Sequence, residues 1–174
     1  LDHARTKHLD RETSVTVLDI NDKMLVEGQK RLKATMYWNT PQVRFQLGNA
    51  EALDRVLPVP ERRNPPASTK RNPILPPLVS EPVPSESVDL YTIAFGIRNC
   101  THIDRVIAEA FRVLKPGGIF ACLEFGKVSL PVLAQLYRQY SFNVLPPLGH
   151  MLVGDRDSYQ YLVESIERFP TQAE

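Results

Sequence analysis

The stretch VDLYTIAFGIRNCTHIDRVIAEAFRVLKPGGIFACLEF, residues 88–125, decides the fold class. Its β-branched and aromatic beginning predicts a strand over 88–95, and the apolar spacing after the polar turn predicts a helix. Lys115-Pro116-Gly117-Gly118 is expected to end this helix and turn the chain into a strand over 119–125. Strand, helix and strand in this order predict a parallel βαβ unit of an α/β protein. The apolar stripe of the helix is expected to comprise Ile103, Val106, Ile107, Ala110, Val113 and Leu114.

The turn Phe95-Gly96-Ile97-Arg98-Asn99 follows the first of these strands. Open parallel sheets place their ligands beyond the carboxyl ends of strands, so this turn is a candidate site. Arg98 carries a permanent charge and is the candidate for chemistry, with a buried carboxylate partner as the alternative role. His102, at the helix start, is either a proton acceptor or a solvated first-turn residue.

A second βαβ pattern lies upstream. Residues 14–20, SVTVLDI, predict a buried parallel strand, Asn21 can cap a helix from Asp22 to about Ala34, and 43–47 predicts the next strand. Asp19 ends the first strand, where a carboxylate can accept hydrogen bonds from both hydroxyls of a ribose. The alternative is a solvated carboxylate that supports the helix cap.

The sequence Gly48-Asn49-Ala50-Glu51 follows the strand over 43–47. The Asn49 amide can donate to and accept from an adenine edge, and small Ala50 allows a ring to approach the backbone. The alternative is a plain turn that enters a short helix.

Proline dominates the middle of the chain: nine of its 15 prolines lie between Pro58 and Pro84. Proline cannot donate a backbone hydrogen bond and restricts its neighbour, which argues against helix or sheet. We therefore expect an extended, mostly disordered surface insertion at about 57–86 within a domain that covers 1–174. A docking segment for a partner is the alternative.

Two helices are expected after the last strand, over 131–142 and 155–168. Tyr159 and Tyr161, on the second helix, are candidates to wall an apolar substrate pocket, with ordinary core packing as the alternative.

Composition excludes several classes of protein. A net charge of +1 does not indicate a nucleic-acid surface. Two cysteines make no disulfide framework, and no Cys/His spacing matches a zinc site, so we expect a reducing compartment and no metal. No apolar run approaches the length of a membrane span. The opening LDHARTKHLDRE lacks a starting Met and is typical of a helix end, so we expect the amino terminus to lie further upstream.

Taken together, the chain resembles UbiE-type ubiquinone/menaquinone biosynthesis C-methyltransferases, which are class I S-adenosylmethionine-dependent enzymes. This resemblance implies a Rossmann-like three-layer αβα sandwich. The matching segments are VLDIN (17–21), GNAEAL (48–53), YTIAFGIRN (91–99), HIDRVIAEAFRVLKPGG (102–118), CLEF (122–125) and SYQYLVESIERFP (158–170).

The resemblance implies C-methylation of a polyprenylated methoxy-benzoquinol ring with S-adenosylmethionine as cofactor. Arg98 would face the ring and stabilise phenolate charge, since its pKa is too high for a proton acceptor, and the base would be a water or His102. The implied cofactor contacts are Asp19, Asn49, Ala50, Ala94 and Phe95. From their positions in the chain, the predicted substrate contacts are Asn99, Tyr159 and Tyr161. Gly126 stands where the family usually has Ser, which weakens one substrate-side contact.

The resemblance also implies partners and a location: other coenzyme Q biosynthesis proteins in a complex, a homodimer, and peripheral contact with the mitochondrial inner membrane from the matrix. The family's glycine-rich strand and loop would precede Leu1, and further strands would follow Glu174, so we expect a truncated chain. A catalytically inactive structural subunit of a quinone-synthesis complex is therefore the alternative. A nicotinamide-dependent reductase would need a glycine fingerprint before Asp19, and FGIRN with RVLKPGG argues against it.

Overall fold

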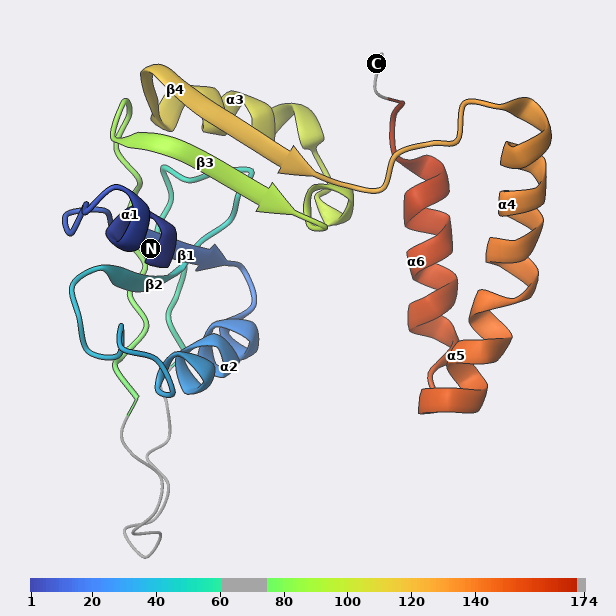
Figure 1. The fold of residues 1–174 in the computed structure, drawn as a ribbon, viewed down its shortest axis with the longest axis horizontal. Helices are drawn as coiled ribbons and strands as arrows, with labels where there is room; N and C mark the ends of the chain where they lie inside the picture. The colour runs from blue at the N-terminus through green and yellow to red at the C-terminus, as the bar shows by residue number, and fades with distance from the viewer. Residues whose placement is uncertain (61–74, 172–174) are drawn as a thin grey trace, which may run out of the picture. The chain divides into compact units, whose positions relative to one another are not determined.

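The computed structural model describes residues 1–60 and 75–171, and Figure 1 shows the ribbon. The described chain forms two compact units, Leu1–Asp89 with Asp104–Gly117, and Leu90–Ile103 with Gly118–Glu174. The elements in chain order are α1 (Asp2–Lys7), β1 (Val15–Asp19), α2 (Asp22–Leu32), β2 (Val43–Leu47), β3 (Val88–Ala94), the 3₁₀ turn η1 (Ile97–Asn99), α3 (Ile103–Val113), β4 (Leu114–Leu123), α4 (Pro131–Asn143), α5 (Leu145–Val153) and α6 (Arg156–Arg168).

The first unit contains the predicted βαβ pattern of β1, α2 and β2. The two strands are parallel, in a register that pairs Val15 with Val43 and Asp19 with Leu47. The helix starts where its cap was expected, because the Asn21 side chain accepts a hydrogen bond from the backbone N–H of Lys23 at 3.0 Å. Since α2 packs on both strands, it makes the crossover that a parallel pair requires.

The core of this unit is a cluster of three leucines. Leu25 from α2, Leu47 from β2 and Leu78 are 1%, 4% and 6% exposed. Burial of each side chain stabilises the fold by about 2 kcal/mol. Leu78 is the unexpected member, because it lies within the range predicted to be a disordered insertion.

The predicted insertion at about 57–86 therefore differs from the structure at its carboxyl-terminal side. Val79 forms a parallel bridge with Gln46, and its carbonyl accepts the Leu47 N–H at 2.8 Å. The prolines keep their carbonyls as acceptors, and Pro76 uses one to bind the Gln29 side chain at 3.2 Å. Residues 61–74, which hold the middle of that prediction, lie outside the described residues.

The strands are less buried than predicted. Val15 and Val17 share one face of β1 and are 40% and 39% exposed. Cys122 on β4 is also exposed. Within the described residues, β1 pairs only with β2 and β3 only with β4. Because each sheet has two strands, many of its side chains stay exposed.

Residues 88–125 form the second βαβ motif, which consists of β3, α3 and β4. The arrows of β3 and β4 run in the same direction in Figure 1, and the strands pair through hydrogen bonds such as that from Phe95 N–H to the Leu123 carbonyl at 2.8 Å. The predicted apolar stripe of α3 is buried at Val106, Ala110 and Val113. It is wrong at Ile107, which is 51% exposed because it lies one position off the buried face.

The predicted turn at Lys115-Pro116-Gly117-Gly118 is also corrected. The strand β4 begins at Leu114, directly after α3, and runs through these residues. Gly117 has a φ of +82°, a conformation that glycine adopts without a steric penalty. The residues expected to form a turn therefore belong to the strand.

Three helices fill the second unit, where two were predicted. The additional helix α5 packs against both α4 and α6. It begins with prolines in its first turn, where their missing N–H groups are not needed, and ends at Gly154 in a left-handed conformation. Gly149 lets α5 approach α6 closely, because a Cβ there would overlap the Tyr159 ring. Among residues 1–60 and 75–171, no helix has the length and hydropathy needed to cross a bilayer.

Candidate functional site

The first group of predicted site residues lies at the carboxyl ends of β1 and β2. The pairing of Asp19 with Leu47 brings Asp19 beside the Gly48-Asn49-Ala50 turn, and the Gly48 N–H donates to the Asp19 carbonyl at 3.0 Å. Gly48 packs closely on Leu18, because a Cβ there would lie 2.8 Å from Leu18 Cδ1 and the leucine side chain would have to shift. The structure therefore brings these residues to one edge of a parallel strand pair.

Both polar side chains also have local roles. Asp19 Oδ1 accepts the Asn21 N–H at 2.8 Å, and Asn49 Oδ1 accepts the Glu51 N–H at 2.9 Å. These bonds are the helix support and turn that were the alternative roles. A carboxylate has about four acceptor positions and an amide also has two N–H donors, so both keep capacity for a ligand. This donor set fits a nucleoside, with the carboxylate for ribose hydroxyls and the amide for adenine.

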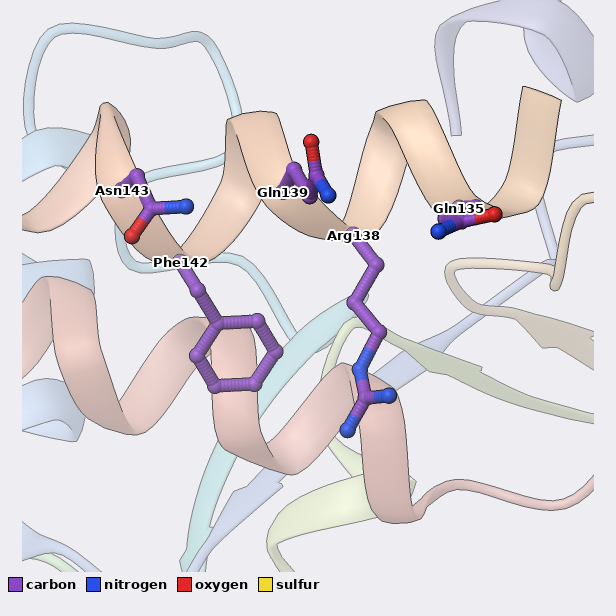
Figure 2. A pocket seen from close by; sticks show the side chains of 5 residues that line it. All are labelled: Gln135, Arg138, Gln139, Phe142 and Asn143. Carbon is purple, nitrogen blue, oxygen red and sulfur yellow. The ribbon is translucent and has the colours of Figure 1, made fainter. Parts of the chain in front are cut away.

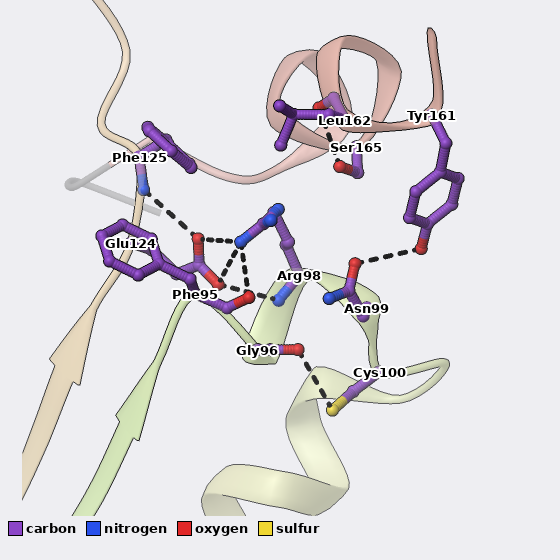
Figure 3. A network of polar contacts seen from close by, with 10 residues as sticks. All are labelled: Phe95, Gly96, Arg98, Asn99, Cys100, Glu124, Phe125, Tyr161, Leu162 and Ser165. Carbon is purple, nitrogen blue, oxygen red and sulfur yellow. Dashed lines mark hydrogen bonds and ion pairs between the residues drawn. The ribbon is translucent and has the colours of Figure 1, made fainter. Parts of the chain in front are cut away.

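The second group surrounds Arg98, in η1 after β3. Arg98 Nη1 donates to Glu124 Oε1 and Oε2 at 3.1 and 2.9 Å and to the Phe95 carbonyl at 2.7 Å (Figure 3). The side chains of Arg98 and Glu124 are 10% and 5% exposed. The alternative role for Arg98, a buried carboxylate partner, is therefore present. Its Nε is also buried, and no acceptor among the described residues binds it.

Phe95 holds a strained backbone conformation beside this pair. Its φ is +53°, which is uncommon for a residue other than glycine and costs about 1–3 kcal/mol. The bonds of Phe95 N–H to Leu123 and of its carbonyl to Arg98 maintain it. The Phe95 and Phe125 ring centroids are 5.0 Å apart, and the Arg98 guanidinium carbon lies 5.3 Å from the Phe125 centroid. A charged, hydrogen-bonded group thus lies in an aromatic environment.

The predicted substrate residues separate into two sets. The Tyr161 hydroxyl, on α6, donates to Asn99 Oδ1 at 3.1 Å, so the structure brings these two together (Figure 3). Tyr159 is partly buried and packs over Gly149, which is the core role named as its alternative. His102 is exposed immediately before α3, and Ala94 is the last residue of β3.

Sequence reasoning missed Glu124 as a site residue. It follows β4 directly, and its carboxylate also accepts the N–H of Arg98 at 3.4 Å and that of Phe125 at 3.3 Å. An acidic residue at the end of an apolar strand, in the sequence CLEF, was the available signal.

A separate pocket of about 350 Å³ lies along α4 (Figure 2). Its lining consists of Gln135, Arg138, Gln139, Phe142 and Asn143. Arg138 Nε pairs with Glu167 on α6 at 3.2 Å, and its guanidinium lies over the Phe142 ring. The pocket includes no predicted site residue and is a groove along one helix face, so its geometry does not mark it as the reaction site.

The parallel strands joined by helices define an α/β fold, and polar side chains at the carboxyl ends of parallel strands are typical of ligand sites in such folds. The chain matches the model of the ubiE/COQ5 methyltransferase family over residues 2–57 and 79–174, and it belongs to this family. The unmatched residues 58–78 fall within the predicted proline-rich insertion.

Curated relatives carry related names. The chain is 49% identical over 170 residues to the mitochondrial 2-methoxy-6-polyprenyl-1,4-benzoquinol methylase of Schizosaccharomyces pombe, covering 98% of this chain and 47% of that protein. It is 47% identical to the ubiquinone/menaquinone biosynthesis C-methyltransferase UbiE of Methylobacterium nodulans, over 92% of this chain and 51% of the relative. The mitochondrial 2-methoxy-6-polyprenyl-1,4-benzoquinol methylase of Drosophila melanogaster is 43% identical, over 93% of this chain and 46% of that protein. The chain spans about half the length of these relatives.

Among solved structures, the [4+2]-cyclase SpnF matches 74% of this chain and 36% of its own, with a TM-score of 0.48 and 19% identity. A likeness this distant carries no functional information. Family membership confirms the class I, Rossmann-like α/β fold and places the chain in a methyltransferase family, a class of enzymes that in general uses S-adenosylmethionine. Neither the inactive structural subunit nor the nicotinamide-dependent reductase gains support. The roles of individual site residues stay predictions.

Proposed function

We propose that the protein transfers a methyl group from S-adenosylmethionine to a ring carbon of a polyprenylated methoxy-benzoquinol in ubiquinone biosynthesis. The observation that carries this proposal is the 43–49% identity, over nearly the whole chain, to relatives named as benzoquinol methylases. The FGIRN turn supports it, because that turn presents the buried Arg98–Glu124 pair at the end of a strand.

The cofactor residues are proposed from their positions in each unit. Asp19 binds the ribose hydroxyls, and Asn49 with Ala50 binds the adenine at the edge formed by β1 and β2. Ala94 and Phe95, at the end of β3, line the cofactor. S-adenosylmethionine supplies an electrophilic methyl group when it is bound.

Arg98 is proposed to act on the ring. Methylation at carbon requires a ring hydroxyl to lose its proton, so that negative charge reaches the carbon that accepts the methyl group. That carbon afterwards loses its own hydrogen as a proton, which makes the ring aromatic again. The Arg98 side chain is 10% exposed and paired with Glu124, so it acts on that charge as a directed N–H donor to the ring oxygen. Asn99, held by Tyr161, is placed beside Arg98 in η1 as a second polar contact. His102 or a water takes the proton, because arginine stays protonated.

The location is proposed as mitochondrial, on the matrix side of the inner membrane, in a complex with other ubiquinone-synthesis proteins and as a homodimer. Three relatives carry the word mitochondrial in their names.

Residues 126–154 contain no Asp or Glu, and α4 exposes an apolar face that suits an anionic lipid surface. The exposed side chains of this face are Val132, Leu133, Leu136, Tyr137 and Tyr140. Leu136→Glu should lower sedimentation with cardiolipin-containing vesicles, while Gln139→Glu in the α4 groove should lower it less; equal effects would contradict the proposal.

Methyl transfer itself tests the proposed function. The purified protein is incubated with labelled S-adenosylmethionine and a short-tailed 2-methoxy-6-prenyl-1,4-benzoquinol. Asp19→Ala should weaken cofactor binding about tenfold or more, the loss expected for a charge-assisted hydrogen bond. Asp54→Ala removes an exposed carboxylate of the same unit and serves as the control. An equal loss in both variants, or no label transfer by the unaltered protein, would contradict the proposal.

A further inference from the structure

The guanidinium of Arg98 is held on one side only. Nη1 makes three contacts, two with the Glu124 carboxylate and one with the Phe95 carbonyl. The contact of Glu124 is with Nη1 alone, although an arginine can also bind a carboxylate through Nε. The orientation of the guanidinium is therefore fixed, while its Nε–H is left without an acceptor among the described residues.

Glu124 does more than neutralise a charge. Its two oxygens accept backbone N–H groups from Arg98 and Phe125, so the carboxylate ties η1 to the chain after β4 (Figure 3). The side chain is only 5% exposed, and electrostatic interactions are stronger in such an environment than in water. A shift of this carboxylate would move the Arg98 backbone and guanidinium together.

The unpaired Nε–H indicates a ligand atom. Buried N–H groups in native proteins nearly always have an acceptor, because an unmet donor destabilises the fold. The Phe125 ring centroid lies 5.3 Å from the guanidinium carbon and 5.0 Å from the Phe95 ring centroid, and such rings favour contact with another flat ring. An oxygen carried on an aromatic ring satisfies both requirements.

Charge narrows the ligand further. Because Glu124 lies 2.9 Å from Nη1, the buried pair has no net charge, and Nε–H acts as a directed donor rather than as a free cation. We propose that Glu124 is a positioning residue that holds Arg98 so that Nε–H binds the oxygen of a phenolic ring. This inference rests on the proposed function, since the phenolic ring is the substrate class named there.

The test uses the Nε–H signal of Arg98 in a nitrogen–proton correlation spectrum of the whole chain, assigned by its loss in Arg98→Lys. The probe is 4-methoxyphenol. In the unaltered protein the probe should shift this signal, and in Glu124→Gln the shift should be lost and exchange of Nε–H with solvent should rise about tenfold. Glu167→Gln, which breaks the exposed Arg138–Glu167 pair in the same unit, should leave the signal and its shift unchanged.

Three results would overturn the positioning role: no shift in the unaltered protein, a full shift in Glu124→Gln, or the same loss in Glu167→Gln. If Glu124→Gln does not fold, Glu124→Asp keeps the charge on a shorter side chain and should give a reduced shift. In the methyl-transfer assay, Glu124→Gln should lower kcat by about 100-fold, the cost of a misplaced catalytic group, with a smaller change in KM. Normal kcat in that variant overturns the positioning role and leaves the proposed function standing. A lost shift in Glu124→Gln without any methyl transfer by the unaltered protein supports the role and overturns the proposed function.

Discussion

Replacing Arg98 with Met should destabilise the second unit severely, because it leaves Glu124 buried without its cation. The side chains of the pair are 10% and 5% exposed, so little solvent is available to the remaining carboxylate. Removal of one member of a buried ion pair costs about 3–5 kcal/mol. The Phe95 carbonyl also loses its 2.7 Å bond, which helps to hold the strained φ of +53°.

The double variant Arg98→Met, Glu124→Leu should be far more stable than the sum of its parts. Each single change leaves one buried group unpaired, whereas the double change replaces both by apolar side chains, which is often close to neutral. The single costs add to about 6–10 kcal/mol, and the double variant should lose no more than about 3 kcal/mol. The coupling free energy should therefore be about 3 kcal/mol or more.

Urea unfolding, followed by the helical circular dichroism signal, measures each free energy of unfolding. A parallel cycle on the exposed pair Arg138–Glu167, whose side chains are 65% and 47% exposed, is the matched control and should give less than about 1 kcal/mol. Additivity of the two single changes at Arg98 and Glu124 within about 0.5 kcal/mol would refute the reasoning.

Three further results are expected. Glu109 accepts hydrogen bonds from Arg112 and from the backbone of Leu53, and the Arg112 guanidinium lowers the pKa of Glu109 below the usual 4.5. The stabilisation that Glu109 provides should be complete above pH 4.5 and should disappear as the pH falls through its folded-state pKa. The stability of Glu109→Gln should therefore depend less on pH in an acid titration. Gly149→Ala should lower the free energy of unfolding by about 1–3 kcal/mol in thermal unfolding, since the new methyl group overlaps the Tyr159 ring. In a protein that already carries Tyr159→Ala, the same substitution should cost much less. Asp155→Ala should lower the melting temperature of the protein, because Asp155 caps α6. An unchanged melting curve would show that this cap contributes nothing.

Local sequence signals predicted the elements whose residues interact mainly with their neighbours. The bounds of β2 were predicted without error, and α2 began at its Asn21 cap, because side-chain alternation and capping act over a few residues. The helix α5 was missed since LPPLGHMLV contains two prolines and a glycine, which usually oppose a helix. Its prolines occupy the first turn and its glycine faces Tyr159, and both facts depend on the three-dimensional packing.

The candidate site shows the same division. The shared edge of Asp19 and Asn49 was predictable, because parallel strands place their carboxyl ends together. The pairing of Arg98 with Glu124 joins residues 26 positions apart and depends on β3 lying beside β4. The burial of Leu78 was equally hidden, since proline content indicates what the backbone of a segment cannot do and not where its side chains pack.

The most direct test of the account is the position of the transferred methyl group. After reaction with isotopically labelled S-adenosylmethionine and a short-tailed 2-methoxy-6-prenyl-1,4-benzoquinol, fragmentation mass spectrometry distinguishes a label on a ring carbon from one on oxygen. The account predicts a label on ring carbon, with transfer reduced in Arg98→Lys far more than cofactor affinity. A label on oxygen, or no labelled product, would contradict it.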